Sequence, residues 1–336
     1  MNILVKKSGL MSTLQDLGRI GYQKYGVLVN GAMDSFSSRL ANILVGNKQA
    51  EAALEMTMLG STMQLPAGII FALTGADLGA TIDGQPVPSF RPVCVTRDCL
   101  LMCGFAKQGC RGYFAVAGGF DVPIIMGSKS TYLRAKIGGF DGRALAAGDV
   151  LKVGTPAPTM QLFVQQIMRK YGANAAFATV PWYAPGTFIF DDNVIRITRG
   201  QQYAWFTEES INNFLNEPYS IALQSDRMGY RLEGEALQYK EKRELVSEPV
   251  TFGSIQVPAD GNPIILLADR QTAGGYPKIA QVVCADLPRL AQRKPKTSLH
   301  FQQVSLAEAE RLYLQQEKFI NKLAVVIQQK LTEVYN

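Results

Sequence analysis

The 336-residue sequence predicts a mainly β protein made of two strand-rich blocks, with few helices and one helix at the C-terminus. Short apolar runs recur along the chain, separated by turns of glycine, proline and aspartate, and 31 residues are glycine. Helical patterns do not alternate with these runs, which argues against a doubly wound sheet and favours barrels or sandwiches. The length, equal to about two average domains, agrees with two blocks.

The strands are predicted from short runs rich in branched and aromatic residues. In the first block these runs are residues 69–73, 80–82, 93–96, 100–103 and 113–116. Asp83-Gly84 follows the second run and predicts a hairpin turn, because this dipeptide accepts the backbone angles that tight turns need. In the second block the runs are residues 194–198, 221–223, 254–257, 264–268 and 280–283.

Two helices carry clear end signals. Asp34 can cap a helix that ends at Gly46-Asn47, and the apolar face of this helix consists of Phe36, Leu40, Ile43 and Leu44. Near the end of the chain, Ser305 and Glu308 form a capping box. The apolar stripe that follows at helical spacing consists of Leu312, Phe319, Leu323, Val326, Ile327 and Leu331. Weaker helix candidates are residues 161–171 and 208–215.

Pro156 and Pro158 suggest a boundary between the two blocks. We therefore predict an N-terminal strand-rich unit over residues 1–155, a mixed connecting segment over 156–190, a second strand-rich unit over 191–304, and the C-terminal helix over 305–336. By default this helix is expected to pack on its own chain, although a partner protein could cover it instead.

Composition argues against two classes of partner. The net charge is only +6, and the densest basic stretch, residues 289–296, has no aromatic residues to stack on bases, so we expect no nucleic-acid partner. The longest apolar stretches have the length of strands and fall far short of the roughly 20 residues that span a bilayer, so we expect no membrane partner. Residues 1–14 lack the apolar core of a signal peptide. We therefore expect a cytoplasmic protein.

The cysteines do not suggest a metal site. They have no CxxC spacing, and their positions are Cys94, Cys99, Cys103, Cys110 and Cys284. His300 is the single histidine, whereas a zinc site needs about four closely spaced ligands, so we expect no metal. The first four cysteines fall in strand-like sequence, and we interpret them as core thiols. The sequence also lacks GxxxxGK[ST] and GxGxxG, the two common nucleotide-binding patterns.

Two polar loops are the strongest site candidates, residues 225–231 and residues 268–276, of which the second follows a buried apolar run. Rigid strands that end in polar loops commonly carry binding groups. Asp269 could act as a general base or orient a water molecule. Arg227 or Arg270 could bind a carboxylate or phosphate through two parallel hydrogen bonds.

The second loop contains further candidates. Gly274-Gly275 would let backbone N–H groups approach an anion. Gln271 is a candidate catalytic residue, and Thr272 and Tyr276 are candidates for substrate binding. A simpler interpretation is a turn that its own polar side chains stabilise, and the pattern alone leaves both interpretations open.

Taken in order, the loops resemble those of a known family. The matching segments are residues 15–19, 31–34, 53–57, 72–77, 115–119, 127–133, 138–140, 225–230, 255–258 and 271–279. Together they cover the range from about residue 3 to residue 300. The sequence resembles the biotin-dependent carboxyltransferase-like family, which includes allophanate hydrolase subunit 2, the KipI antagonist KipA and the C subunit of 5-oxoprolinase.

The resemblance implies two cyclophilin-like β-barrel units and a partner protein of the B-subunit or KipI type. It also implies a subunit, inactive alone, of a complex that uses ATP to hydrolyse 5-oxoproline to glutamate, with a protein of the A-subunit type as a further expected partner. Asp269 and Gln271 would then position water or stabilise the tetrahedral intermediate. The residues expected to bind this small-molecule amide are Arg227, Arg270, Thr272, Gly274, Gly275 and Tyr276.

Two alternatives remain open within the resemblance. One is a regulatory protein of the KipI-antagonist type, which would bind an inhibitor protein through an apolar surface. The other is half of a carboxyltransferase that acts on a urea-like amide. ATP would be used by the complex, since no ATP site is identifiable in this sequence, and the absence of a Met-Lys-Met motif places any biotin on another protein.

Overall fold

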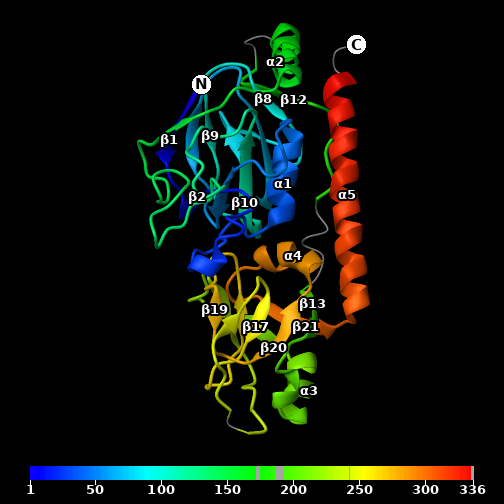
Figure 1. Ribbon diagram of the computed structural model, residues 1–336. Helices are drawn as coiled ribbons and strands as arrows, with labels where there is room; N and C mark the ends of the chain where they lie inside the picture. The colour runs from blue at the N-terminus through cyan, green and yellow to red at the C-terminus, as the bar shows by residue number, and fades with distance from the viewer. Residues whose placement is uncertain (172–174, 187–192, 242, 334–336) are drawn as a thin grey trace. The chain divides into compact units, whose positions relative to one another are not determined.

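The computed structural model describes residues 1–171, 175–186, 193–241 and 243–333, and the chain forms two compact units (Figure 1). The first unit comprises residues 1–19, 34–190 and 319–336, and the second comprises residues 20–33 and 191–318. The chain is mainly β, which confirms the predicted fold class. The domain limits predicted at residues 155, 190 and 304 stay a prediction.

The first unit contains two six-stranded antiparallel sheets. The strand order of one is β11 (Val150–Lys152), β1 (Asn2–Lys7), β4 (Thr62–Leu65), β9 (Cys99–Met102), β6 (Thr81–Ile82) and β7 (Gln85–Pro86). The order of the other is β12 (Phe177–Thr179), β8 (Val93–Val95), β5 (Ile70–Asp77), β10 (Gln108–Val116), β3 (Ala53–Thr57) and β2 (Met11–Gln15).

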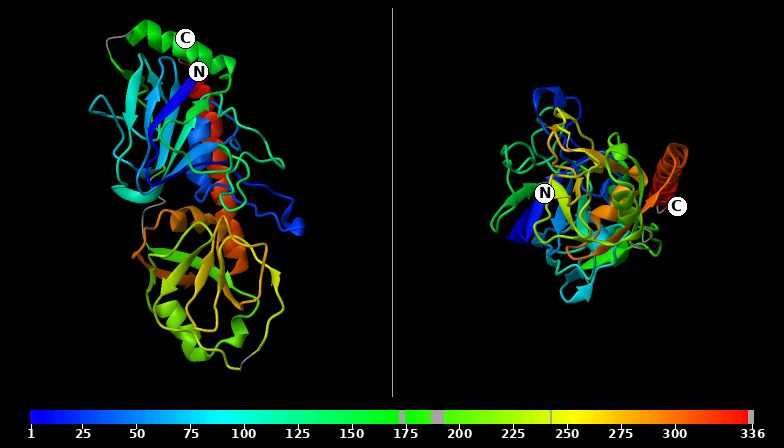
Figure 2. Two further views of the ribbon diagram at one scale, coloured as in Figure 1. Left: turned by 90° about the vertical axis from the view of Figure 1, so that its left-hand side faces the viewer. Right: turned by 90° about the horizontal axis from the view of Figure 1, so that it is seen from below.

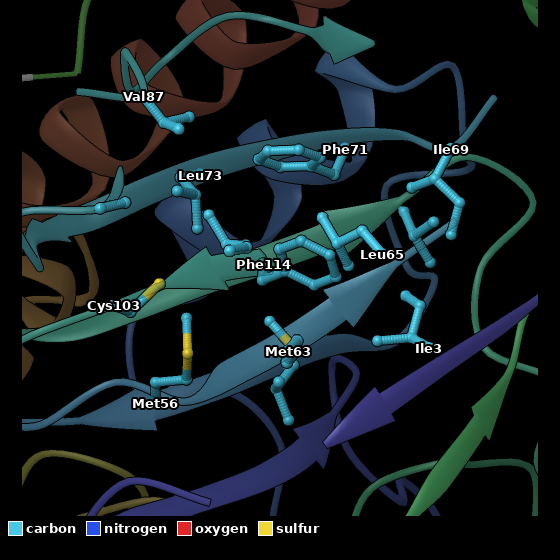
Figure 3. Packing of buried hydrophobic residues seen from close by; sticks show 14 of the residues in the cluster. Ile3, Met56, Met63, Leu65, Ile69, Phe71, Leu73, Val87, Cys103 and Phe114 are labelled. Atoms are coloured by element: carbon cyan, nitrogen blue, oxygen red, sulfur yellow. The ribbon is translucent and has the colours of Figure 1, made fainter. Parts of the chain in front are cut away.

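The two sheets share one hydrophobic core, in which side chains from both point toward one another (Figure 3). Phe71 of β5 and Phe114 of β10 stack with ring centroids 5.2 Å apart. Ile3 of β1 and Met63 of β4 reach the same core from the other sheet, and all four side chains are completely buried. Burial of each such side chain stabilises the fold by about 1.5–3 kcal/mol, so this core joins the two sheets.

Helix α1 (Ser35–Leu44) packs on β5 and β10, on the face of their sheet away from the core. The Asp34 carboxylate accepts a hydrogen bond from the Ser37 N–H at 2.9 Å, which confirms the predicted cap. The Thr74 hydroxyl of β5 donates to the Ser37 carbonyl at 2.7 Å. Because both faces of the sheet are covered, β5 is buried without the alternation of a half-exposed strand.

Two polar loops of the first unit, residues 15–19 and 127–131, are joined by buried hydrogen bonds. The Asp16 carboxylate accepts a hydrogen bond from the Ser130 hydroxyl at 2.6 Å. Arg19, which is completely buried, donates from Nη2 to the Ser130 carbonyl at 2.9 Å. Such a hydrogen-bonded network of buried groups holds loops rigidly, so these conspicuous sequence motifs have a structural role here.

The second unit is a closed barrel of seven strands (Figure 2). Their order is β13 (Val194–Arg199), β20 (Lys278–Val282), β17 (Ser254–Gln256), β18 (Ile264–Leu266), β15 (Gly229–Glu233), β14 (Tyr219–Ile221) and β21 (Ser298–Gln303). Strands β13 and β21 run parallel, and the other neighbouring strands run antiparallel. A separate two-stranded sheet pairs β16 (Glu248–Pro249) with β19 (Ala273–Gly274).

The described part of the chain has four further α-helices and three short 3-10 helices. They are α2 (Pro158–Tyr171), α3 (Glu208–Asn216), α4 (Leu287–Ala291), α5 (Leu306–Glu333), η1 (Gln23–Tyr25), η3 (Tyr203–Trp205) and η4 (Cys284–Asp286). Helix α5 begins where the capping box predicts, because the Ser305 hydroxyl accepts a hydrogen bond from the Glu308 N–H at 3.1 Å. Of its predicted apolar stripe, Ile327 and Leu331 are buried, whereas Val326 is 42% exposed. None of the helices described here has the length and apolar character needed to cross a membrane.

The placement of the cysteines predicts a single fast-reacting thiol. Four of the five cysteines are buried, Cys284 is exposed, and none forms a disulfide bond. Burial raises the pKa of Cys94 and Cys103 to about 12 and that of Cys99 to about 11, and the thiolate is the reactive form. Partial burial also raises the pKa of Cys284, so its exposure to reagent is what distinguishes it from the other cysteines. At mildly alkaline pH we therefore expect a thiol reagent to modify Cys284 first in the native protein, and all five cysteines after denaturation. A Cys284→Ser variant should lose the fast phase of labelling, and rapid modification of a second thiol would contradict this assignment.

Candidate functional site

A buried ion pair joins the two polar loops that are predicted to carry the site. Arg227 Nε lies 2.9 Å from Asp269 Oδ2 and Arg227 Nη2 lies 3.0 Å from Asp269 Oδ1, so the guanidinium donates two parallel hydrogen bonds to the carboxylate. Arg227 is 6% exposed and Asp269 is 8% exposed. The structure therefore brings Arg227 and Asp269 together in a geometry that excludes most water.

The register of the barrel explains why these loops meet. Strand β15 pairs antiparallel with β18, and Gly229 lies opposite Leu266. The chain therefore enters β15 and leaves β18 at the same end of the pair. The pairing continues beyond the strands, where the Asp269 N–H donates to the Arg227 carbonyl at 2.8 Å. The two backbones are thus held next to each other independently of the side-chain ion pair.

A third segment of the second unit, residues 20–33, contributes to the same cluster. Asn30 Nδ2 donates to Asp269 Oδ1 at 2.8 Å, and the Gly31 carbonyl accepts a hydrogen bond from Arg227 Nη2 at 2.7 Å. Asn30 and Gly31 have φ angles of 58° and 93°, in a region that asparagine and glycine enter more easily than other residues. Asn30 was not among the predicted site residues, and its signal in the sequence is the Asn-Gly pair, which is typical of tight turns.

These contacts engage much of the hydrogen-bonding capacity of the pair. The Asp269 carboxylate accepts three side-chain hydrogen bonds, two from Arg227 and one from Asn30. Such an arrangement also fits the simpler interpretation, in which the polar side chains of the loops stabilise the turns. A catalytic role of Asp269 and a substrate-binding role of Arg227 therefore stay predictions.

Arg270, the next residue along the chain, has a different environment. It is 9% exposed, and in the described part of the chain its guanidinium makes one hydrogen bond, from Nη1 to the Leu267 carbonyl at 3.3 Å. Its Nε is buried and has no hydrogen-bond partner there. The guanidinium lies over the Phe252 ring, 5.8 Å from the centroid. Burial lowers the pKa of Arg270 to about 10, although the nearby Asp269 opposes this shift, so the side chain stays charged at neutral pH.

The rest of the second loop surrounds a buried glutamine. Gln256 of β17 is 1% exposed and donates from Nε2 to the Tyr276 carbonyl at 3.2 Å. Its Oε1 accepts a longer hydrogen bond, 3.5 Å, from Gln271 Nε2. The Tyr276 side chain is half exposed. Sequence patterns did not identify Gln256, because a glutamine within a strand has no spacing signal of its own.

Close packing explains the two glycines of this loop. A Cβ atom at Gly274 would lie 2.7 Å from Gln256 Nε2, and one at Gly275 would lie 3.2 Å from the Leu245 carbonyl oxygen. The predicted role of these glycines in presenting backbone N–H groups to an anion stays a prediction, as does substrate binding by Thr272 and Tyr276. Within the described ranges, no group of three or more His, Cys, Asp or Glu residues could hold a metal ion.

A known family profile matches most of the chain. The family is described as "Carboxyltransferase domain, subdomain A and B", and the match extends over residues 25–303. The chain belongs to this carboxyltransferase family. The matched range of this family member contains the Arg227–Asp269 pair and Arg270, so the candidate site lies within the part of the chain that the family shares.

Two bacterial proteins named as the C subunit of 5-oxoprolinase are similar to this carboxyltransferase-family chain over nearly their full length. The Haemophilus influenzae protein is 37% identical over 319 residues, which is 95% of this chain and 96% of the relative. The Escherichia coli protein is 37% identical over 318 residues, with the same two coverages. The crystal structure of the K. lactis urea amidolyase matches with a TM-score of 0.84 at 29% identity, covering 96% of this chain and 20% of that one.

Proposed function

We propose that this carboxyltransferase-family chain is a subunit of an ATP-dependent 5-oxoprolinase, which hydrolyses 5-oxoproline to glutamate. One observation carries the proposal: 37% identity extends over nearly the whole of two proteins named as the C subunit of 5-oxoprolinase. The name of these relatives implies other subunits. We expect one partner of the B-subunit or KipI type and one of the A-subunit type, and a cytoplasmic location, where buried thiols stay reduced.

The chemistry of the substrate explains the need for ATP. 5-Oxoproline is a cyclic amide with a carboxylate, and its amide bond is stabilised by resonance. Phosphorylation of the carbonyl oxygen by ATP would activate this bond. ADP would leave, water would add to the carbonyl carbon, and the C–N bond would break, so that the nitrogen leaves as an amine and the carbonyl carbon becomes that of an acyl phosphate. A second water would then hydrolyse the acyl phosphate to the side-chain carboxylate of glutamate and inorganic phosphate. The sequence shows neither of the two common nucleotide-binding patterns, so we expect this chain to contribute one part of a site shared with its partners.

Among the predicted residues, Arg270 is the best placed to hold the substrate carboxylate. The Arg227 guanidinium already donates to Asp269 and to the Gly31 carbonyl. Arg270 makes one hydrogen bond of 3.3 Å in the described part of the chain, so most of its donors remain for a ligand. Gln271, in the same loop and partly exposed, would then lie near the amide as a hydrogen-bond donor or acceptor.

Reconstitution tests this proposal. We expect the purified chain alone to release no glutamate from 5-oxoproline and ATP, because it supplies only part of the site. Co-expressed with its two expected partners, it should elute with them from a size-exclusion column and support ATP-dependent glutamate release. A stable specific complex should bury more than about 1,000 Å². Robust activity of the chain alone would contradict the shared site, and separate elution at micromolar concentration would contradict the complex.

The match to urea amidolyase favours one second candidate. This match has a TM-score of 0.84. The alternative function is that of half of a carboxyltransferase, which would act on a urea-like amide while another protein carries the biotin. The same reconstitution separates the two functions. A complex that leaves 5-oxoproline unchanged but carboxylates a urea-like amide from carboxybiotin would replace the first candidate with the second.

A further inference from the structure

A small pocket in the second unit is lined by residues of β13, β17 and β20, near the candidate loop. Its volume is about 210 Å³, below the roughly 300 Å³ at which pockets for drug-sized ligands begin. We name it the β20 pocket, and the lining residues used below are Arg199, Gly200, Thr251, Ser254, Lys278 and Gln281. The size suits a ligand of only a few atoms.

Two residues with cationic side chains line this pocket, and one of them, Arg199, also donates from Nε to Gln303 Oε1 at 3.2 Å. Arg199 is the last residue of β13 and lies opposite Ala280 of β20, and Lys278 is the first residue of β20. The chain passes very closely here, because a Cβ atom at Gly200 would lie 2.2 Å from the Lys278 carbonyl oxygen. A glycine at this position therefore lets the end of β13 pack directly on Lys278. No aspartate or glutamate is among the described residues that line the pocket.

Lys278 is a buried cation, and some of its ammonium N–H donors are unused. The residue is 7% exposed, and its Nζ lies 2.8 Å from Glu248 Oε1. Glu248 is also held by Gln202, whose Nε2 donates to the same oxygen at 2.8 Å. An ammonium group has three N–H donors, and Nζ has no further partner in the described part of the chain. Burying a cation with unused donors costs free energy, so the arrangement points to an acceptor that enters the pocket.

Neutral polar groups that bond to one another form the rest of the lining. Ser254 of β17 lies opposite Gln281 of β20, and the hydroxyls of Ser254 and Thr251 both donate to Gln281 Oε1, at 2.9 and 2.8 Å. These contacts hold the polar wall in one arrangement. Since the Gln281 amide itself donates to the Phe252 and Val282 carbonyls, the donors for a carboxylate or phosphate oxygen are those of the two cations.

We propose that the β20 pocket binds a small oxyanion, a carboxylate or a phosphate, between Lys278 and Arg199. This site goes beyond the proposed function, since it requires neither partners nor turnover. If the proposed function also holds, the phosphate released from ATP is one source of such an anion, and the substrate carboxylate is the other source only if Arg270 does not hold it.

Titration calorimetry on the full chain tests the pocket, with inorganic phosphate and 5-oxoproline in separate experiments at constant ionic strength. We expect saturable one-to-one binding of at least one of them at millimolar concentration.

The test variant is the double substitution Lys278→Met with Glu248→Gln. It removes both charges of the pair, so that the Glu248 carboxylate is not left without its counter-charge. Its affinity should fall at least about tenfold, the loss expected for a hydrogen bond to a charged group. Arg199→Gln, at an exposed residue, should also weaken binding, whereas the exposed Lys240→Met is the matched control.

Each outcome of the titrations supports or contradicts anion binding in the β20 pocket. Binding of phosphate alone assigns the pocket to a phosphate, binding of 5-oxoproline alone assigns it to a carboxylate, and binding of both supports their shared chemistry. Absence of binding by wild type, or unchanged affinity in both the double variant and Arg199→Gln, would overturn the proposal. Loss of 5-oxoproline binding in Arg270→Met but not in these variants would also overturn it for the carboxylate. Failure of reconstituted 5-oxoprolinase activity, with anion binding intact, would count against the proposed function and not against the pocket.

Discussion

An Asp269→Asn variant is expected to destabilise the second unit by about 3–5 kcal/mol. The substitution keeps the shape of the side chain but removes the charge that balances Arg227. Arg227 is 6% exposed, so its guanidinium would lie in a low-dielectric environment without a counter-charge. Urea denaturation followed by circular dichroism measures the loss, as a lower midpoint for the transition of the second unit.

Two further variants separate the charge from the packing. In the double variant Asp269→Asn with Arg227→Met, both charges are absent, and we expect much of the lost stability to return. Glu308→Gln breaks the exposed pair between Glu308 and Arg311, whose atoms lie 2.6 Å apart, and should change the midpoint little. If Asp269→Asn unfolds like wild type but inactivates the complex, the carboxylate is catalytic and does not serve mainly to hold the loops.

Local signals in the sequence predicted local structure well. The Asp34 cap, the Ser305 cap and the Asp83-Gly84 turn each appear where expected, and Asp83 and Gly84 have φ angles of 51° and 78°. The second bond of the predicted box is replaced, because the Glu308 carboxylate bonds to Arg311. Each of these features depends on a few neighbouring residues and on the backbone angles that they allow. Such information is contained in a short window of sequence.

Features that depend on distant partners were harder to predict. The run at 221–223 was expected to be a strand, but β14 (Tyr219–Ile221) ends at Ile221, and Leu223 is 64% exposed. Tyr219 and Ser220 find their partners in β21, far along the chain, and this pairing sets the position of the strand. The contact between Asn30 and Asp269 joins residues 239 positions apart, so no window of sequence could show it.

The other large effect is expected at Arg270. We expect Arg270→Met to lower kcat/KM of the reconstituted 5-oxoprolinase by roughly 10²–10³-fold. This loss is typical when a group that stabilises the charge of the substrate or of the transition state is removed. The reason is the shortage of partners for this guanidinium, which makes one 3.3 Å hydrogen bond in the described part of the chain and has a buried Nε without a partner. Steady-state kinetics on the complex, with 5-oxoproline varied at saturating ATP, measures the effect.

The same substitution should leave the chain as stable as wild type, or more stable. Arg270 is 9% exposed, and its desolvation is only weakly compensated, since Asp269 is already paired with Arg227. Methionine retains the length and much of the apolar contact with Phe252 while removing the buried charge. A functional residue is expected to support activity at a cost in the stability of the fold. Removal of a structural residue would instead lower both stability and activity.

Two control variants distinguish a functional role of Arg270 from a structural one. Arg270→Lys keeps a positive charge without the planar fork, so we expect it to recover part of the lost kcat/KM, mainly through a lower KM for 5-oxoproline. Arg231→Met removes an exposed cation from β15 of the same unit and should leave both activity and stability near wild type. If Arg270→Met melts well below wild type, the guanidinium stabilises the loop. If it melts normally and turns over normally, the substrate carboxylate is held elsewhere. Only an inactive variant with an undiminished melting temperature, partly rescued by lysine, identifies Arg270 as the residue that binds the substrate.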